Sequence, residues 1–494
     1  MVNTKKKEII IEEPNVNVSE IDIPNEEVKW CSIPLNEIIS NFNRFEASAF
    51  SLEAKYAREL IKNSKYSLKA LYGEEAFTDK AFYPGRFKRN YISGKNKHAI
   101  GFLGSSEMLE VKPCPIKFLN IEQNDLENLY VCNGDILISR SGTIGNIGYV
   151  SKTLKKYLIS EHSIRLRNIK HSGYIYTFLK TMIGQNLIKT NIYGSVVNQI
   201  EPEHLKNIFI PNPPDILKQE IHNLIVKSYA LRDESNDLID EAEKLLIEEL
   251  KLPPIEEFQP KYLDKTSEIR NFEVSLSKLN NRVDTSYHLP IVNSLLTHLQ
   301  KYSKEIINIG NRVLSDKIIL AGVFKRTYVG ENEGVPFLGG KDIMQLSPNV
   351  EKFLSRKVHE KLIKKSLEVK ENMILITDRG TIGNVMIVPK HFEGWAVSQN
   401  VIKLVCSSND IAGYIYSFLN SQYGEILLQK ETYGSVINMI DDKNVAQIPI
   451  PLLKNENIQK KINDLVLLAN KKRYKAYQLE QKAIKIVNEK VIYT

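Results

Sequence analysis

Residues 136–146 read ILISRSGTIGN, and residues 374–384 read ILITDRGTIGN, 374 − 136 = 238 positions later. A match of this length and quality indicates an internal repeat rather than chance. If each copy lies in a repeated domain, the protein contains two similar units. Its function then depends on what one unit does and on what separates the two.

The repeat extends well beyond this stretch. GYIYTFLKT at 173 matches GYIYSFLNS at 413, which is 413 − 173 = 240 positions later. The offset changes by only a few residues along the chain, so loop insertions account for it and the unit is a whole domain with its connector. Further matches pair Ser160-Glu161-His162 with Ser398-Gln399-Asn400, YGSVVNQI at 193 with YGSVINMI at 433, Asn43-Arg44 with Asn281-Arg282, and Phe87-Lys88-Arg89 with Phe324-Lys325-Arg326.

Composition is that of a soluble globular protein. The 494 residues are 42% hydrophobic and 26% charged, and no stretch is apolar enough for a signal peptide or a membrane span, so we expect a cytoplasmic protein. The four cysteines form no CxxC pair and the nine histidines no HExxH motif, so we predict no bound metal. The net charge of +8 permits a polyanionic partner without requiring one.

Each unit begins with short apolar runs separated by glycine, asparagine and proline, which predicts strands joined by tight turns. Glycines 142, 145 and 148 fit backbone bends better than a helix. Residues 173–194 have the pattern of an amphipathic helix that ends at Gly194. The fold class expected for each unit is therefore mixed α/β (α+β).

A long charged helix follows each unit, because residues 215–252 contain neither proline nor glycine before Pro253. Residues spaced three and four apart predict a heptad seam in both helices, and the simplest partner for the first helix is the second, in an antiparallel coiled coil. The alternative is two surface helices, each packed on its own domain. The seam comprises Ile221, Leu224, Ser228, Leu231, Ser235, Leu238, Ala242 and Leu245 in the first helix, and Ile462, Leu465, Ala469, Lys472, Ala476, Leu479, Ala483 and Ile486 in the second.

The predicted organisation is thus two globular domains in a tandem pseudo-twofold repeat, separated by two long helices. Its segments are a mobile, partly acidic tail (1–28), the first domain (29–212), a central spacer helix (213–252), a linker (253–271), the second domain (272–452) and a C-terminal spacer helix (453–494).

The duplicated motifs resemble those of one known family, the specificity (S) subunits of type I restriction-modification systems, also called HsdS. The resemblance covers about residues 29–494 and includes both GTIGN loops, the patterns from YGSVVNQI to IFIPNPP and from YGSVINMI to IPIPLL, and the N-R-x-x-x-S patterns NRFEASAF and NRVDTSYH. It implies two target-recognition domains that each read one half of a split, asymmetric sequence in double-stranded DNA. It also implies docking of two methylation subunits and of restriction subunits. S-adenosylmethionine, ATP and Mg would be bound by those partners, and this chain would hold no cofactor.

Residues that contact DNA are predicted from their chemistry, because the family's base-reading segments vary. Clustered cations neutralise phosphates, arginine also binds guanine through two hydrogen bonds, and aromatic residues interleave with the cations here. A solvated basic face without a ligand is the alternative, and the glycines beside Arg140 and Arg379 fit a structural turn. The candidates are Arg86, Lys88, Arg89, Tyr91, Lys95, Lys97 and Arg140 in the first domain, and Lys325, Arg326, Tyr328, Lys341 and Arg379 in the second.

Catalytic motifs are incomplete in this chain. Asn212-Pro213-Pro214-Asp215 resembles an adenine methyltransferase motif but has Asp215 where an aromatic residue should stack on the base. Pro214-Asp215 and Glu249-Leu250-Lys251 would lie about 50 Å apart at opposite ends of one helix, too far to share a nuclease metal. We therefore expect no catalysis by this chain. The competing hypotheses are a two-module RNA-binding or scaffolding protein, and an enzyme that carries its own methyltransferase.

Overall fold

The computed structural model describes residues 32–40, 50–192, 198–258, 272–279, 282–434 and 438–494. The predicted tail (1–28), Asn43-Arg44 and most of the predicted linker (253–271) lie outside the described residues. Within the described part of the chain, no helix is long and apolar enough to cross a membrane.

The first globular unit, called head 1 (residues 50–212), contains a four-stranded antiparallel sheet in the order β2-β8-β5-β6. A second sheet has the order β4-β3-β7, in which β3 and β7 are parallel, and β1 pairs with β9. The strands are β1 Leu68–Ala70, β2 Lys80–Phe82, β3 Ala99–Leu103, β4 Lys117–Asn120, β5 Ile136–Ser139, β6 Ile147–Tyr149, β7 Leu158–Ile159, β8 Ser163–Arg167 and β9 Phe209–Pro211.

The second unit, head 2 (residues 282–452), repeats this topology and adds one strand, β12, at the edge of its second sheet. Its sheets have the orders β11-β18-β15-β16 and β12-β14-β13-β17, with β13 and β17 parallel, and β10 pairs with β19. The predicted mixed fold and its duplication are therefore confirmed. The strands are β10 Glu305–Asn308, β11 Ser315–Ile319, β12 Tyr328–Val329, β13 Gly334–Leu338, β14 Phe353–Ser355, β15 Ile374–Thr377, β16 Val385–Ile387, β17 Ala396–Val397, β18 Val401–Cys406 and β19 Pro449–Leu452.

Short helices pack around the sheets of both heads, and α1 precedes head 1. The single helix predicted at 173–194 is instead two helices, because Thr181 is extended and its side chain accepts a hydrogen bond from Gly184 N as the cap of a new helix. The short helices are α1 Leu35–Ser40, α2 Leu52–Lys62, α3 Ser172–Lys180, α4 Met182–Lys189, α6 Pro290–Tyr302, α7 Arg356–Leu362, α8 Asn409–Leu419, α9 Gln422–Lys430 and α10 Asp442–Ala446.

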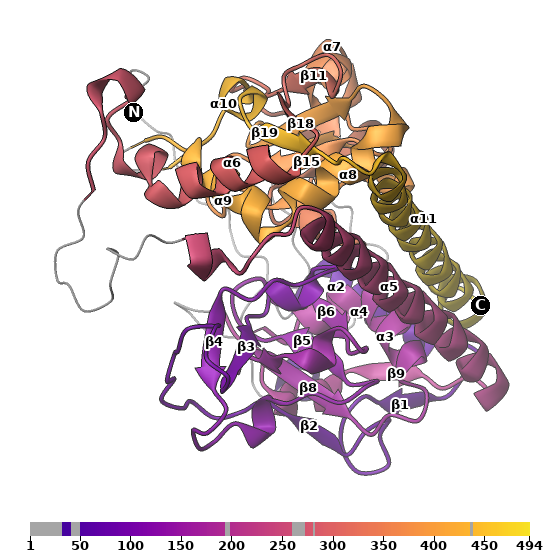
Figure 1. Ribbon diagram of the computed structural model, residues 1–494. Coiled ribbons are helices and arrows are strands. Elements are labelled where there is room, and N and C mark those ends of the chain that lie inside the picture. The colour runs from indigo at the N-terminus through magenta and orange to yellow at the C-terminus, as the bar shows by residue number, and fades with distance from the viewer. Residues whose placement is uncertain (1–31, 41–49, 193–197, 259–271, 280–281, 435–437) are drawn as a thin grey trace, which may run out of the picture.

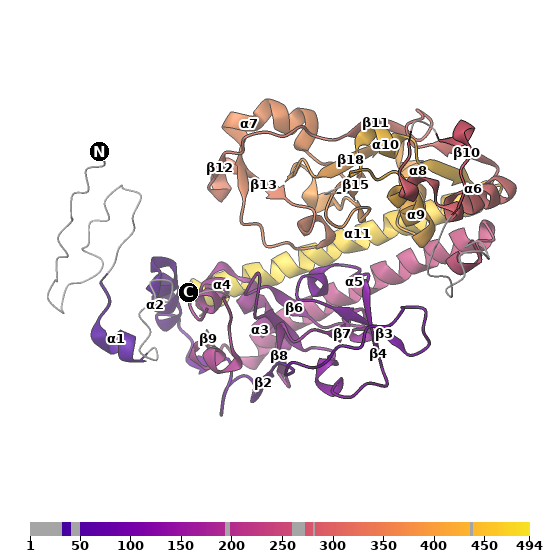
Figure 2. The ribbon, with the colours of Figure 1, turned by 90° about the vertical axis from the view of Figure 1, so that its left-hand side faces the viewer.

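The two long helices, α5 (Asp215–Glu249) and α11 (Glu456–Val487), pack along each other between the heads (Figures 1 and 2). Ser228 donates a hydrogen bond to Ala476 O at 2.7 Å near the middle of α5, and Lys461 pairs with Glu241 at 3.4 Å near its C-terminal end. Since residue numbers rise along one helix as they fall along the other, the pair is antiparallel, as predicted.

The buried stripe of each helix differs from the predicted seam at alternate positions, except that Ile486 of α11 is buried as predicted. Ile221, Ser228, Ser235 and Ala242 of α5 are buried, but the predicted leucines between them are only half-buried, and the residue after each leucine is buried instead. In α11, Lys472 is half-buried and pairs with Glu234. Each helix packs against its partner and against helices of the heads, α3 and α8, so its buried face is wider than a coiled-coil seam and turned from it. The residues that take the leucine positions are Ile225, Arg232, Ile239 and Leu246.

Each long helix begins beside one head and ends in the core of the other. The C-terminal end of α5, with Ile239, Ala242 and Leu246, belongs to the core of head 2. The C-terminal end of α11 and the following turn bury Val487 and Val491 in the core of head 1. The core of head 1 therefore includes a segment from the far end of the chain, whereas the core of head 2 lies within residues 239–469.

The heads also touch each other directly. Glu110 forms an isolated antiparallel bridge with Gln345, and Val111 N donates to Met344 O at 3.0 Å. Glu110 follows the short helix Glu107–Leu109, and Gln345 follows its repeat counterpart Asp342–Met344. A residue thus pairs with its own equivalent, which places the pseudo-twofold axis at this contact.

Candidate nucleic-acid interface

A cluster built on an arginine lies at the edge of the second sheet of head 1. Arg89 lies over the ring of Phe102 on β3, with 5.3 Å between its guanidinium carbon and the ring centroid, and 5.9 Å from that of Phe87. Its guanidinium pairs with Glu161 and donates to the Tyr91 hydroxyl at 3.3 Å. Backbone pairing of Tyr91 with Leu119 of β4 holds this segment against the sheet. We call Phe87, Arg89, Tyr91, Phe102 and Glu161 the head 1 cluster.

Head 2 contains the same arrangement. Arg326 lies 5.5 Å from the ring centroid of Phe337 on β13, and its guanidinium donates to Gln399 Oε1 at 2.7 Å. The ring of Phe337 also contacts Phe324 and Tyr328, with centroids 6.4 Å and 6.1 Å apart. Phe324, Arg326, Tyr328, Phe337 and Gln399 form the head 2 cluster. The two copies therefore preserve an arginine supported by aromatic rings.

The clusters differ in the residue that faces the arginine. The Glu161 carboxylate neutralises Arg89, and although burial works against the charged form, hydrogen bonds to Tyr91 and Glu161 raise the pKa of Arg89. Gln399 is a neutral amide and leaves the charge of Arg326 uncompensated at that contact, on a side chain that is exposed. Head 2 therefore presents more positive charge at this position than head 1.

Most of the other residues predicted to contact DNA are exposed, and they lie close to these clusters in the sequence. Tyr91 and Tyr328 are 44% and 42% exposed. Lys95 pairs with Glu256, which lies beyond the end of α5, and Lys341 lies at the turn before the short helix that contacts head 1. Contact of these residues with DNA therefore stays a prediction. The exposed cations among them are Arg86, Lys88, Lys95, Lys97, Lys325, Arg326 and Lys341.

Arg140 and Arg379 each form an ion pair with a carboxylate of their own head. Arg140 is 8% exposed, pairs with Glu201 and lies 3.9 Å from the ring centroid of Tyr83. Arg379 is more exposed and donates to the buried carboxylate of Asp378 at 3.0 Å. In this structure Arg140 supports the fold beside the loop and does not present its charge to solvent, whereas Arg379 remains accessible.

The GTIGN loops are built as tight turns. Gly142 and Gly145 have φ of 76° and 87°, and Gly380 and Gly383 have φ of 80° and 86°, the left-handed region that favours glycine. The Ser139 hydroxyl closes the first loop by donating to Thr143 O at 2.6 Å and accepting from Asn146 N at 2.9 Å. This geometry supports the interpretation of these glycines as architecture; Gly148, by contrast, is part of strand β6.

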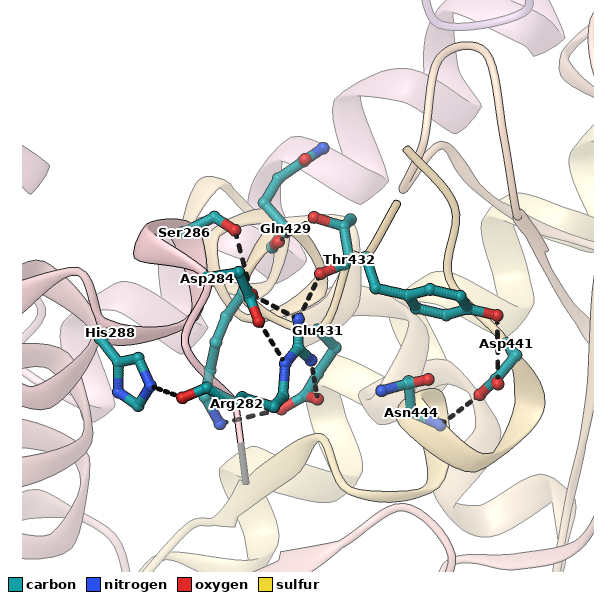
Figure 3. A network of polar contacts seen from close by, with 11 residues as sticks. Arg282, Asp284, Ser286, His288, Gln429, Glu431, Thr432, Asp441 and Asn444 are labelled. Atoms are coloured by element: carbon teal, nitrogen blue, oxygen red, sulfur yellow. Dashed lines mark hydrogen bonds and ion pairs between the residues drawn. The ribbon is translucent and has the colours of Figure 1, made fainter. Parts of the chain in front are cut away.

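The second N-R-x-x-x-S motif anchors the start of head 2 (Figure 3). Arg282 donates to Asp284 at 3.0 Å and to Thr432 O at 2.5 Å, and lies 3.7 Å from Glu431 just after α9. His288 bonds the Arg282 carbonyl at 2.7 Å. The motif is therefore a structural clamp in head 2, and its counterpart at Arg44 lies outside the described residues.

Two features of the candidate interface were not predicted from the sequence. Glu161 and Gln399 were aligned as repeat equivalents, but nothing in the pattern indicated that they face the arginines 72 and 73 residues earlier. The basic helix α7 was also missed, although the lysine density of RKVHEKLIKK at 356–365 is a signal that a charge count would have found.

The duplicated architecture agrees with a family model that matches the chain in two places. Two solved structures are similar over most of their length: the S subunit of the type I restriction-modification system from M. genitalium (15% identity, 86% of this chain and 95% of that chain, TM-score 0.31) and the HsdS subunit from Thermoanaerobacter tengcongensis (14% identity, 82% and 93%, TM-score 0.26). No curated protein matches. The family model described as type I restriction modification DNA specificity domain matches residues 74–244 and again residues 317–467, more than half of the chain. The chain therefore belongs to the family of type I restriction modification DNA specificity domains, and it carries that domain twice.

Proposed function

We propose that the protein is the specificity subunit of a type I restriction-modification complex and that each head reads one half of an asymmetric, bipartite DNA sequence. The observation that carries the proposal is the duplicated cluster, in which an arginine is held by aromatic rings in each head. An arginine held in this way can give two parallel hydrogen bonds to guanine or to a phosphate. Because Glu161 and Gln399 differ, the two halves of the target should differ.

In this proposal the antiparallel helix pair and the contact between the heads fix the distance between the half-sites. The 35 residues of α5 extend over about 52 Å at ~1.5 Å per residue. Two heads on such a support meet the same face of a duplex about one helical turn, ~34 Å, apart. The helix pair would thus determine the spacer length between the halves.

The catalytic activities are assigned to partners. Two methylation subunits would dock on the long helices and adjoining segments, one for each repeat, and would bind S-adenosylmethionine. Restriction subunits would use ATP and Mg. Exposed apolar residues on the helices, Ile216 and Val226 on α5 and Leu468 on α11, fit such docking. The complex would act in the cytoplasm, and this chain would bind no cofactor.

Methylation of a split sequence is the expected outcome when the chain is combined with methylation subunits. Mapping modified bases in the host genome should show a methylated bipartite motif that disappears when this gene is deleted and returns when it is restored. Binding of the complex to single-stranded RNA in preference to duplex DNA would instead favour the RNA-binding alternative. Robust methylation by the isolated chain would show that it carries its own catalytic site.

Arg89→Ala and Arg326→Ala should each weaken recognition by one head only. We expect each change to cost about 1–3 kcal/mol of binding free energy and to relax the base preference in one half-site, a different half for each variant. Selection of preferred targets from a DNA library randomised at both halves measures this directly. Relaxed preference in both halves with either variant would contradict the assignment of one half-site to each head.

A further inference from the structure

The helix α7 and the turn that follows it, Ile363–Leu367, carry a dense positive charge on the surface of head 2. His359, Ile363 and Leu367 are buried and attach this segment to the head. One exposed acid, Glu360, lies among the cations and pairs with Lys364 at 2.6 Å. The exposed cations are Arg356, Lys357, Lys361, Lys364 and Lys365.

The equivalent segment of head 1 has the opposite charge. In both heads the segment joins repeat-equivalent strands, β14 to β15 in head 2 and β4 to β5 in head 1. Residues 121–135 of head 1 contain no lysine or arginine, and Glu122, Asp125 and Glu127 are exposed there. The basic helix is therefore not a shared feature of the two heads, and the common fold does not account for its positive charge.

The basic helix is fixed directly beside the head 2 cluster. Thr327, between Arg326 and Tyr328, donates its backbone N–H to His359 Nε2 of α7 at 3.1 Å. The His359 ring also packs on Phe324, with centroids 5.5 Å apart. Figure 2 shows α7 near β12, on the side of head 2 away from the long helices. The helix thus extends the positive surface around Arg326.

Three of the lysines are without an ion-pair partner in the part of the chain that the structure describes: Lys357, Lys361 and Lys365. Lys357 and Lys361 are four residues apart on one helix and so lie on the same face, where like charges repel each other. A polyanion relieves this repulsion, and double-stranded DNA supplies a row of phosphates.

We propose that α7 is an additional contact of head 2 with the DNA phosphate backbone, so that head 2 binds DNA with a stronger electrostatic component than head 1. The inference rests on the proposed function and adds to it an element that only one head possesses. Phosphate contacts carry no sequence information directly. The helix should therefore strengthen binding without changing the sequence that is recognised.

The test compares two charge-matched variants of the complex with methylation subunits. K357Q/K361Q removes two cations from α7, and the control K301Q/K443Q removes two exposed cations from α6 and α10 of the same head. Affinity for a duplex with both half-sites is measured as a function of salt. Because each lost phosphate contact lowers the slope of log affinity against log salt by ~0.9, the α7 variant should lower it by about 1.8. Its affinity should then change about tenfold less than that of the wild type between about 50 mM and 200 mM salt.

Three outcomes separate the possibilities. A lower slope for the α7 variant alone, with the methylated motif unchanged, supports the inference. An unchanged slope, or an equal decrease in the control, overturns it while leaving the proposed function intact. If the wild-type complex shows no preference for any split DNA sequence, the proposed function fails and this inference fails with it.

Discussion

Deleting residues 483–494 is expected to unfold head 1 and to leave head 2 folded, although head 1 is formed by residues more than two hundred positions earlier. The deleted segment contributes Ala483, Ile486, Val487, Val491 and Ile492 to the core of head 1. The core of head 2 uses the earlier part of α11, with Ile462, Val466 and Ala469, and keeps those contacts.

The expected effect is close to the whole stability of a domain. Ile486, Val487, Val491 and Ile492 are at most 7% exposed. Burial of each such side chain contributes about 1.5–3 kcal/mol, so their loss costs roughly 6–12 kcal/mol. Domains of this size have unfolding free energies of about 5–15 kcal/mol, so head 1 should be largely unfolded at 25 °C.

Hydrogen exchange followed by peptide mass spectrometry measures the two heads separately. Peptides from β5 and β8 should lose protection in the truncated protein, while those from β15 and β18 should keep it. Deletion of Tyr493 and Thr494 alone, which removes partly exposed residues, is the matched control and should leave both heads protected. Unchanged protection of head 1 after the longer deletion would show that its core does not need α11.

The sequence was sufficient to predict the duplication and the long helices, because both depend on local patterns. The matched motifs predicted two units of one topology, and the strand orders of the two heads agree apart from the additional strand β12 of head 2. The predicted helices at 213–252 and 453–494 correspond to α5 and α11, since proline precedes α5 and neither helix contains glycine or proline. Antiparallel pairing followed from the repeat, because two equivalent helices related by a twofold axis perpendicular to them run in opposite directions.

The contacts of a helix that packs against several other elements at once could not be predicted from such local patterns. A heptad pattern assumes one partner, but α5 packs against α11 and against helices of both heads, so Arg232 and Ile239 are buried where Leu231 and Leu238 were predicted. No local sequence pattern indicates that the C-terminal end of α5 enters the core of head 2 and that of α11 enters the core of head 1. At the interface, the repeat aligned Glu161 with Gln399, but only the fold brings them to Arg89 and Arg326.

Glu480→Ala should be the most destabilising single substitution in the helix pair. Glu480 of α11 is fully buried and pairs with Arg232 of α5 at 2.5 Å. It also accepts hydrogen bonds from Tyr176 of head 1, at 2.6 Å, and from Ser347 of head 2. One carboxylate therefore connects both helices and both heads, and its removal leaves the Arg232 charge buried and uncompensated. Such a loss costs about 3–5 kcal/mol.

The effect should depend on pH in a defined direction. Burial alone raises the pKa of Glu480, but Arg232, Lys180 and the hydrogen bonds from Ser347 and Tyr176 outweigh it and lower the pKa to about 2. A carboxyl whose pKa is lowered by folding stabilises the folded state fully above its unfolded pKa of ~4.3 and loses that contribution as pH falls towards 2. The difference in unfolding free energy between the wild type and Glu480→Ala should therefore be constant near neutral pH and decrease below pH ~4.

Arg473 provides the matched control for Glu480→Ala. It is the repeat counterpart of Arg232, carries the same charge and is fully buried. Within the described residues its guanidinium contacts Ser235 and Asn236 at 3.3 Å and 3.4 Å and has no carboxylate partner. Replacing a buried charge that lacks a carboxylate partner with an apolar side chain removes its desolvation cost, so Arg473→Met should be neutral or stabilising. Urea unfolding of both variants measures the difference. If Arg473→Met were as destabilising as Glu480→Ala, general packing of the helix pair, and not the Glu480 ion pair, would account for both losses.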